Sequence, residues 1–275
     1  MKMNQRKCGV QTGKLDGWEY HLAGDFQAKT LFIQFMDKAE LDCLREEVKL
    51  VCALTSKTSK NSDVSGNAQP FLMAGVGVTD WNAQLSPWYA PAVRGTQVFS
   101  GHAQDTLDFL EQSLIPGLMS QFPALASGII EKRNENGSNG AKSNGMKSNG
   151  TIGIGGYSLA GLFALWASCK SSSFQGTAAV SPSVWFPGWL PFLAEHPVRS
   201  GCVYLSLGRK EEKAGNPVMA QVGDALRETK EMLDQRSDQK VSSILEWNPG
   251  NHFFEPRRRM AKGFAWLLEA FSNTF

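Results

Sequence analysis

The chain has 275 residues, of which 42% are hydrophobic and 20% charged, and its formal net charge at pH 7 is +2. This composition excludes a disordered, collagen-like or low-complexity protein, and the near balance of charges provides no long-range attraction to nucleic acid or anionic lipid. We therefore expect neither nucleic acid nor a membrane as a partner. The length suits one large α/β domain, so a single domain over residues 1–275 is expected.

The cysteines and the first residues bear on the compartment. The five cysteines are odd in number, far apart and never in a C-x-x-C pair, which argues against a disulfide framework and against a zinc site. The opening seven residues are not followed by the apolar core of a secretory signal. Two long uncharged stretches, residues 148–169 and 171–194, contain several glycines or prolines and are interpreted as buried elements rather than membrane spans. We expect a cytoplasmic protein without a bound metal.

Segments of strand length alternate with segments of helical periodicity from residue 30 onward. Strands are predicted over residues 30–36, 71–78, 152–156, 176–180, 202–207 and 241–247, and helices over about 41–51, 103–118, 159–170, 217–235 and 256–271. This alternation is typical of an α/β fold with a mostly parallel central sheet and helices on both faces. Residues 134–150 are nearly all Asn, Gly, Ser and Lys, so a mobile surface insert is expected there.

A short motif, Gly-Tyr-Ser-Leu-Ala at residues 156–160, joins a predicted strand to a predicted helix. This is the setting of a nucleophile elbow, in which a tight turn holds a serine hydroxyl clear of the sheet. Small residues two before and two after the serine, here Gly156 and Ala160, let the helix cross closely. Ser158 is therefore the candidate nucleophile. The alternative is a glycine-rich turn that only packs, because the motif is short and the chain rich in glycine.

Two histidines follow Ser158, as the chain order of this class of hydrolase requires. His252 comes after the strand predicted at 241–247, through a turn that delivers its side chain to the carboxyl edge of the sheet, whereas His196 precedes a strand and lies at the opposite end. We expect His252 to be the general base. A structural or exposed histidine is the competing interpretation.

The acid of a catalytic triad should follow the strand at 202–207, where the loop contains Glu211 and Glu212. Glu211 is the prediction and Glu212 the alternative, and a solvated run of charges is the third possibility. The acid would hold the tautomer of the imidazole and stabilise its charged form while the imidazole takes the serine proton.

Stabilisation of a developing oxyanion needs two backbone N–H groups. One is expected from Leu159, directly after the nucleophile, and the other from the loop that begins at Met36 and Asp37. The Asp37 side chain can serve as a helix N-cap as well.

Aromatic side chains near the same edge suggest a substrate pocket. Trp81 and Trp88, with Tyr157 beside the nucleophile, are candidates for its walls, and packing of the two tryptophan rings in the core is an equal alternative.

Two further patterns are interpreted as structural. The glycines before Ser158 resemble a dinucleotide-binding loop, but serine replaces the third glycine and no acidic residue follows about 20 positions on, so no cofactor is expected. The three consecutive arginines at 257–259 are interpreted as a solvated helix face rather than a phosphate patch.

Four segments together resemble the esterase family of the α/β-hydrolase superfamily that includes enterochelin (siderophore) esterases and S-formylglutathione hydrolases. They are GGYSLAGLFAL at 155–165, VSPSVW at 180–185, Gly208 with Glu211, and NHFF at 251–254. The resemblance covers roughly residues 30–271 and implies an α/β-hydrolase fold with Ser158, His252 and Glu211 as nucleophile, base and acid. Two departures are a glutamate in place of the usual aspartate, which leaves a Ser-His dyad compatible with the sequence, and Ala160 in place of glycine.

The predicted function is that of a serine esterase that cleaves a small-molecule carboxylic ester through an acyl-enzyme on Ser158, with no cofactor. An acyltransferase or thioesterase on the same scaffold is an alternative, as is a catalytically silent binding module. The sequence specifies neither the ester nor the oligomeric state.

Overall fold

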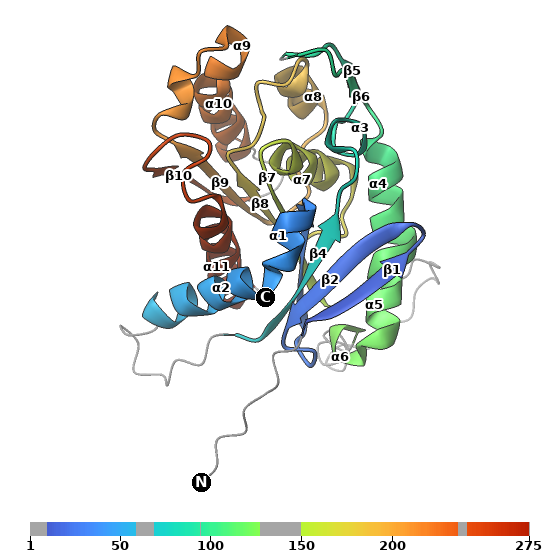
Figure 1. The fold of residues 1–275 in the computed structure, drawn as a ribbon. Helices are drawn as coiled ribbons and strands as arrows, with labels where there is room; N and C mark the ends of the chain where they lie inside the picture. The colour runs from blue at the N-terminus through green and yellow to red at the C-terminus, as the bar shows by residue number, and fades with distance from the viewer. Residues whose placement is uncertain (1–9, 59–68, 94, 127–149, 236–240, 275) are drawn as a thin grey trace, which may run out of the picture.

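The computed structural model describes residues 10–58, 69–93, 95–126, 150–235 and 241–274, and the central feature of these residues is an eight-stranded sheet (Figure 1). Its strands lie in the order β1-β2-β4-β3-β7-β8-β9-β10. All neighbours from β4 to β10 are parallel, and β1 and β2 join the edge antiparallel. The bounds are β1 Gln11–Leu15, β2 Trp18–Gly24, β3 Thr30–Met36, β4 Phe71–Gly77, β7 Thr151–Tyr157, β8 Gly176–Val180, β9 Cys202–Gly208 and β10 Ser242–Asn248.

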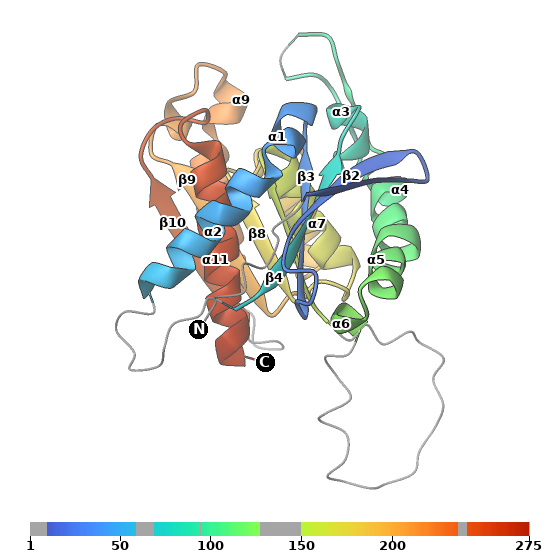
Figure 2. The ribbon, with the colours of Figure 1, turned by 60° about the horizontal axis from the view of Figure 1, so that its bottom comes forward.

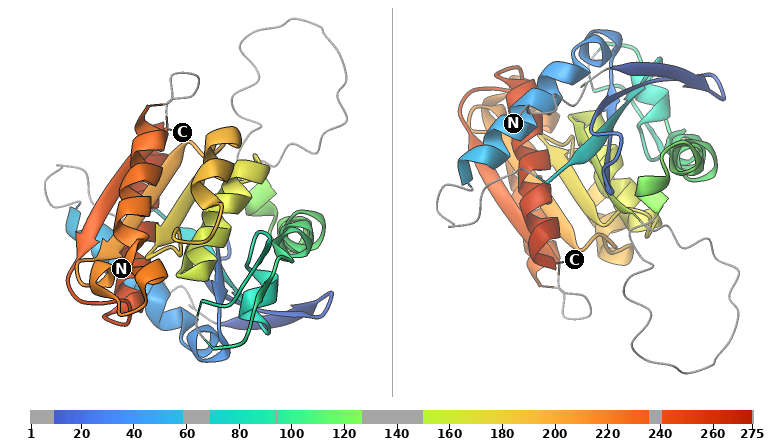
Figure 3. Two further views of the ribbon diagram at one scale, coloured as in Figure 1. Left: turned by 90° about the horizontal axis from the view of Figure 1, so that it is seen from above. Right: turned by 90° about the horizontal axis from the view of Figure 1, so that it is seen from below.

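Helices cover both faces of this sheet, as the sequence predicts. One face is covered by α1 (Lys38–Asp42), α2 (Leu44–Thr58) and α11 (Pro256–Thr274), and Figure 2 shows α2 crossing in front of α11. The other face packs against α4 (Ala103–Phe109), α5 (Ile115–Gln121), α7 (Leu159–Lys170), α8 (Trp189–Glu195) and α10 (Val222–Asp234). The views along the vertical axis in Figure 3 show the sheet between these two layers. Every described residue of α7 except Lys170 is buried, which explains why this helix is apolar all round.

The hairpin formed by β1 and β2 is absent from the sequence prediction. Its first strand is short and largely exposed, so its side chains give no clear alternation. The turn between the strands, however, is Asp16-Gly17 with φ of 48° and 87°, and Asp-Gly is a strong signal for such a hairpin turn. The hairpin could therefore have been found from its turn rather than from its strands.

Several predicted helices differ in detail from the observed ones. The helix predicted at 103–118 runs to Gln121 and contains a π-helical turn, Leu110–Leu114, which ends two residues before Pro116. Proline has no N–H to donate within a helix, and a wider turn accommodates this loss. The helix predicted at 217–235 is divided into α9 (Pro217–Ala220) and α10. Between β4 and α4 lie the short α3 (Trp81–Gln84) and the strand β5 (Tyr89–Ala90), which pairs with β6 (Phe99–Ser100).

The insert expected at 134–150 lies outside the described residues except for Gly150. Among the helices that the structure describes, none is both long and apolar enough to span a membrane.

Candidate active site

The four parallel strands at one side of the sheet each deliver a polar residue to the same edge. Ser158 follows β7, Ser181 follows β8, Glu211 lies three residues after β9, and His252 lies four residues after β10. Because the strands are adjacent and parallel, their carboxyl ends meet, and side chains from distant parts of the chain converge there.

Ser158 occupies a strained turn between β7 and α7. Its φ is 60° and its ψ is −122°, a combination that residues with a side chain rarely adopt. Two residues earlier, a Cβ atom on Gly156 would come within 2.3 Å of the backbone of Ala160, so only glycine permits this crossing of strand and helix. The geometry is that of the nucleophile elbow expected from the motif.

His252 and Glu211 form a close pair. His252 Nδ1 lies 2.7 Å from Glu211 Oε2, which leaves Nε2 of the imidazole unused by this contact. The two loops that carry them are joined by backbone hydrogen bonds, in which Lys210 N donates to Gly250 O at 3.0 Å and Arg209 N donates to Asn248 O at 2.9 Å. The parallel pairing of β9 and β10 thus continues into the loops and fixes the distance between the acid and the imidazole.

The Glu211 carboxylate is buried, with 6% of the residue exposed, and its second oxygen accepts three hydrogen bonds. Oε1 accepts from Gly208 N at 2.7 Å, from Ser181 Oγ at 2.8 Å and from Arg259 Nη2 at 2.8 Å. Burial acts to raise the pKa of Glu211, but the hydrogen bonds from His252 and Arg259 outweigh it and lower the pKa to about 2. Glu211 is therefore a carboxylate at neutral pH, oriented toward the imidazole.

Glu212 does not share this environment, although it is the next residue. Its carboxylate accepts a hydrogen bond of 2.7 Å from Arg227 Nη2 on α10, whereas the imidazole of His252 contacts the carboxylate of Glu211. The 3₁₀ turn Glu211–Lys213 sends the two adjacent side chains in different directions. Of the two predicted acids, the structure brings Glu211 to the histidine.

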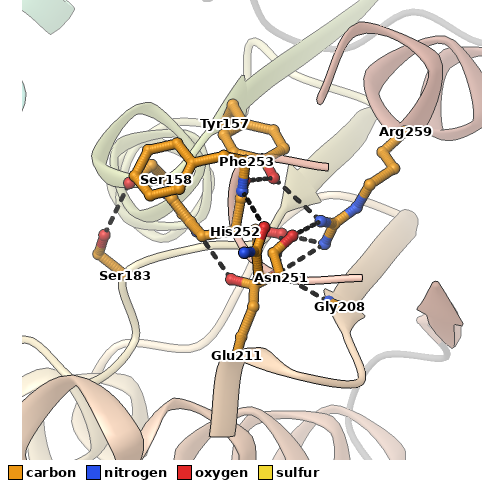
Figure 4. Close-up of polar contacts among 10 residues, drawn as sticks. Tyr157, Ser158, Ser183, Gly208, Glu211, Asn251, His252, Phe253 and Arg259 are labelled. Atoms are coloured by element: carbon orange, nitrogen blue, oxygen red, sulfur yellow. Dashed lines mark hydrogen bonds and ion pairs between the residues drawn. The ribbon is translucent and has the colours of Figure 1, made fainter. Parts of the chain in front are cut away.

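Arg259 corrects an expectation from the sequence. The arginines at 257–259 were interpreted as a solvated face, yet Arg259 is 2% exposed and forms an ion pair with Glu211. Arg257 and Arg258 are exposed, as expected. Arg259 is buried because the first turn of α11 packs against the loops after β8, β9 and β10, whose polar groups accept its hydrogen bonds (Figure 4).

Ser158, His252 and Glu211 line one cavity of about 830 Å³. In this conformation Ser158 Oγ contacts Ser183 Oγ at 3.4 Å, its one hydrogen-bond partner in the described part of the chain, rather than the imidazole. The remaining wall combines aromatic, aliphatic and cationic side chains, among them Trp185, Phe253, Met219, Val222, Lys210 and Lys213. Trp185 and Phe253 were not predicted as wall residues. Their places beside VSPS and directly after His252 are the sequence signal that could have found them.

The backbone N–H groups predicted to stabilise an oxyanion differ in whether they already donate a hydrogen bond. Leu159 is the first residue of α7, and its N–H donates to no acceptor among the described residues. Asp37 is the N-cap of α1: its side chain accepts from Glu40 N at 2.8 Å, and its own N–H donates to Glu40 Oε2 at 3.0 Å. Met36 is buried in β3, and neither it nor Asp37 lines the cavity.

The other predicted wall residues lie elsewhere. The Tyr157 hydroxyl donates to the backbone oxygen of His252. This side chain therefore holds the backbone of the loop at residues 249–255, which carries His252 and is called the histidine loop below. Trp88 donates to Pro187 O at 2.8 Å and packs against Phe186 and Phe192, and Trp81 is half-buried against the same core. These three side chains are absent from the lining of the cavity, and core packing accounts for the two tryptophans.

No family model matches the sequence, and no curated protein matches it. Solved structures do resemble it. An IroE-like serine hydrolase from Shewanella oneidensis superposes with a TM-score of 0.70 at 16% identity, over 96% of this chain and 81% of that one. The siderophore hydrolase EstA from Aspergillus nidulans gives 0.62 at 15% identity, over 98% of both chains. The enterobactin esterase from Shigella flexneri gives 0.62 at 15% identity, over 98% of this chain and 61% of that longer one.

These neighbours are α/β-hydrolase-type proteins, and the chain has the α/β-hydrolase fold. The predicted fold class is thereby confirmed. Within the residues that the structure describes, no three His, Cys, Asp or Glu side chains are grouped so that they could hold a metal ion.

Proposed function

We propose that this protein is a serine hydrolase that cleaves a small-molecule carboxylic ester, with Ser158 as nucleophile, His252 as general base and Glu211 as the acid that orients the base. One observation carries the proposal: a serine in a strained elbow opens into the same cavity as an imidazole whose Nδ1 lies 2.7 Å from a buried carboxylate. A serine with ordinary dihedral angles, or a histidine with no carboxylate beside it, would not support this assignment of roles.

Acylation follows from this arrangement. The Ser158 hydroxyl turns from Ser183 toward His252 Nε2, gives its proton to the imidazole and attacks the ester carbonyl. The resulting imidazolium is stabilised by the Glu211 carboxylate and then donates the proton to the departing alcohol, so the C–O bond of the ester breaks as a neutral alcohol leaves. In the second half, His252 takes a proton from water, the hydroxyl attacks the acyl-enzyme, and Ser158 recovers its proton from the imidazolium.

The negative charge that develops on the carbonyl oxygen needs donors that are already in place. The Leu159 N–H is one, because it has no acceptor among the described residues and lies at the positive end of the twelve-residue helix α7. The Met36-Asp37 segment remains the proposed source of the second donor. The Asp37 N–H can serve only when Glu40 releases it, since the capping box occupies it now.

The structural neighbours support the same class of reaction. They include an IroE-like serine hydrolase, a siderophore hydrolase and an enterobactin esterase. The cavity suits a compact organic ester, because about 830 Å³ lies within the usual range for small-molecule sites and its walls are partly aromatic.

The test is hydrolysis of a panel of 4-nitrophenyl esters by the wild type and by Ser158→Ala. We expect the variant to lose at least about 10³-fold in kcat while keeping the wild-type melting temperature, because only the attacking oxygen is removed. Ser183→Ala is the matched control: it removes the hydroxyl that Ser158 now contacts but keeps the nucleophile, so it should lose less than about tenfold. A Ser158→Ala variant with wild-type turnover would refute the proposal.

Two measurements separate the proposed esterase from its rivals. Product analysis in the presence of added alcohols and amines would reveal an acyltransferase, and matched oxygen esters and thioesters would reveal a thioesterase. A catalytically silent binding module would turn over none of these substrates.

A further inference from the structure

We propose that Arg259 is a positioning residue of this active site, which holds the acid and the histidine loop in register and limits the negative field that Glu211 exerts on His252. The inference rests on the proposed function, because it assigns a role to a residue that acts through the triad. Arg259 does not line the cavity, so it is placed to act on the triad and not on the substrate.

The first support is the number of segments that one guanidinium joins. Nη2 donates to Ser181 Oγ after β8 and, at 2.8 Å, to Glu211 Oε1 after β9. Nη1 donates at 3.0 Å to the hydroxyl of Tyr157 at the end of β7 and at 3.3 Å to the backbone oxygen of Asn251 after β10. The four strand ends that carry the triad and its neighbours therefore meet at one side chain, and all four Nη protons are used.

The second support concerns the histidine loop. Arg259 holds the carbonyl of Asn251, and the Tyr157 hydroxyl that it also contacts donates to the carbonyl of His252. Two successive carbonyls of this loop are thus fixed from the side opposite Ser158 (Figure 4). Because Phe253, the next residue, is 82% exposed, this inner attachment adds to the backbone hydrogen bonds between the two loops in placing the imidazole.

The third support is the division of the Glu211 carboxylate. Arg259, Ser181 and Gly208 donate to Oε1, and the imidazole alone contacts Oε2. Oε1 is thereby saturated, and the carboxylate can turn only its other oxygen toward Nδ1. The positive charge on Arg259 also offsets part of the carboxylate's charge, because both groups are buried where screening by water is weak.

The charge of Arg259 and the geometry of its hydrogen bonds can be tested separately, because different substitutions remove them. Lysine at position 259 would keep the charge but has no planar fork, so it cannot make the four hydrogen bonds of the guanidinium. Methionine would remove the charge as well. Without that charge, the carboxylate stabilises the imidazolium more strongly, and the neutral base is available only at higher pH. Besides Glu211 and Arg259, the titratable groups around His252 are the Tyr157 phenol on β7 and the ammonium groups of Lys210 and Lys213 on the cavity wall, which both variants leave unchanged.

The experiment measures kcat and KM for 4-nitrophenyl acetate from pH 5 to 9 in the wild type, Arg259→Lys, Arg259→Met and Arg258→Met. We expect Arg259→Lys to lose about tenfold or more in kcat, with KM within twofold of the wild type. The acid limb of its profile of kcat against pH should not move. Arg259→Met should lose at least as much, and its acid limb should move to higher pH by about one unit. Arg258→Met removes the same charge from the neighbouring exposed position, where the partner is Glu255, and should resemble the wild type.

The outcomes are distinct. An Arg259→Met variant that loses kcat without a shift of the acid limb shows a merely structural role and overturns the effect on the field. Should that variant fail to fold, Arg259→Lys decides, because wild-type kcat in it would overturn the positioning role. If the wild type itself neither hydrolyses esters nor reacts with a fluorophosphonate, the proposed function fails and the role of Arg259 fails with it.

Discussion

Two buried glutamates in different regions of the molecule have opposite acid–base properties. Glu211, at the carboxyl edge of the sheet, is 6% exposed, and Glu47, in the first turn of α2 over one face of the sheet, is 3% exposed. Burial and the repulsion of Glu40 raise the pKa of Glu47 to about 8, whereas the pKa of Glu211 lies at about 2. Similar burial therefore gives a proton-binding group in one region and a permanent carboxylate in the other.

The difference lies in the donors around each carboxylate. Four hydrogen-bond donors, one of them the Arg259 cation, surround Glu211. Glu47 has a single side-chain donor, Gln34 Nε2, at 3.5 Å from Oε2, and its Oε1 has no partner in the described part of the chain. A buried carboxylate stays charged only where donors replace the lost water. The polar groups at the strand ends provide such a site, and the apolar layer beneath α2 does not.

The largest expected effect comes from Glu211→Gln. The amide keeps the shape but cannot stabilise the imidazolium, so kcat/KM should fall by about 10³-fold or more. It also leaves Arg259 buried without its counter-charge, so the free energy of unfolding in urea should fall by about 3 to 5 kcal/mol. Glu212→Gln is the matched control at the adjacent position. Its surface pair with Arg227 contributes less than about 1 kcal/mol, and activity should stay within about twofold. Equal losses in the two variants would contradict the assignment of Glu211.

The next largest effect is the dependence of the free energy of unfolding on pH that arises from Glu47. Below pH 4.5 Glu47 is protonated in both the folded and the unfolded chain. Between 4.5 and about 8 only the unfolded chain releases the proton, so the free energy of unfolding decreases by about 1.4 kcal/mol per pH unit from this group alone. Glu47→Gln removes this dependence and should be more stable than the wild type at pH 8, but not at pH 4.5. Urea titrations at both values check this, and parallel curves for the two proteins would contradict it.

Glu211 contributes the opposite dependence, because its pKa is lower in the folded chain than the ordinary value of 4.5. Its stabilisation of the folded chain is present above pH 4.5 and is lost as the pH falls toward 2.

Ser181→Ala, the smallest change, removes one neutral donor from the Glu211 carboxylate and should lower the free energy of unfolding by about 1 kcal/mol at pH 7. Thermal melts at pH 7 measure this. A loss as large as that of Glu211→Gln would mean that the donors do not act as separate, additive contributions.

Most of the sheet could be predicted from the sequence because its strands are continuous apolar runs bounded by loops. Helix α7 and strand β8 have the predicted bounds, and Ser158 follows β7 as its motif requires. The sequence favours Glu211 but leaves Glu212 open, since the two glutamates are adjacent and the direction of each side chain in a short 3₁₀ turn decides which of them meets His252.

Arg259 could not have been predicted from periodicity. The apolar side chains of α11, such as Met260 and Phe264, define a helical stripe on which Arg257, rather than Arg259, would lie at 100° per residue. Arg259 is buried by Tyr157 at the end of β7 and by the loops after β8, β9 and β10, rather than by the apolar face of the sheet. Such contacts have no local signature, and the same limit applies to the cavity, whose walls come from the loops after β7, β8, β9 and β10 and from α9 and α10.

The central claim is that Ser158 is activated by the His252–Glu211 pair. Its most direct test is labelling of the wild type and of Ser158→Ala with a fluorophosphonate at pH 7.5, with the modified residue located by mass spectrometry of peptides. We predict a single phosphonylated residue, Ser158, in the wild type and no label in the folded variant. A folded wild type that stays unlabelled, or a label that persists in Ser158→Ala, would contradict the claim.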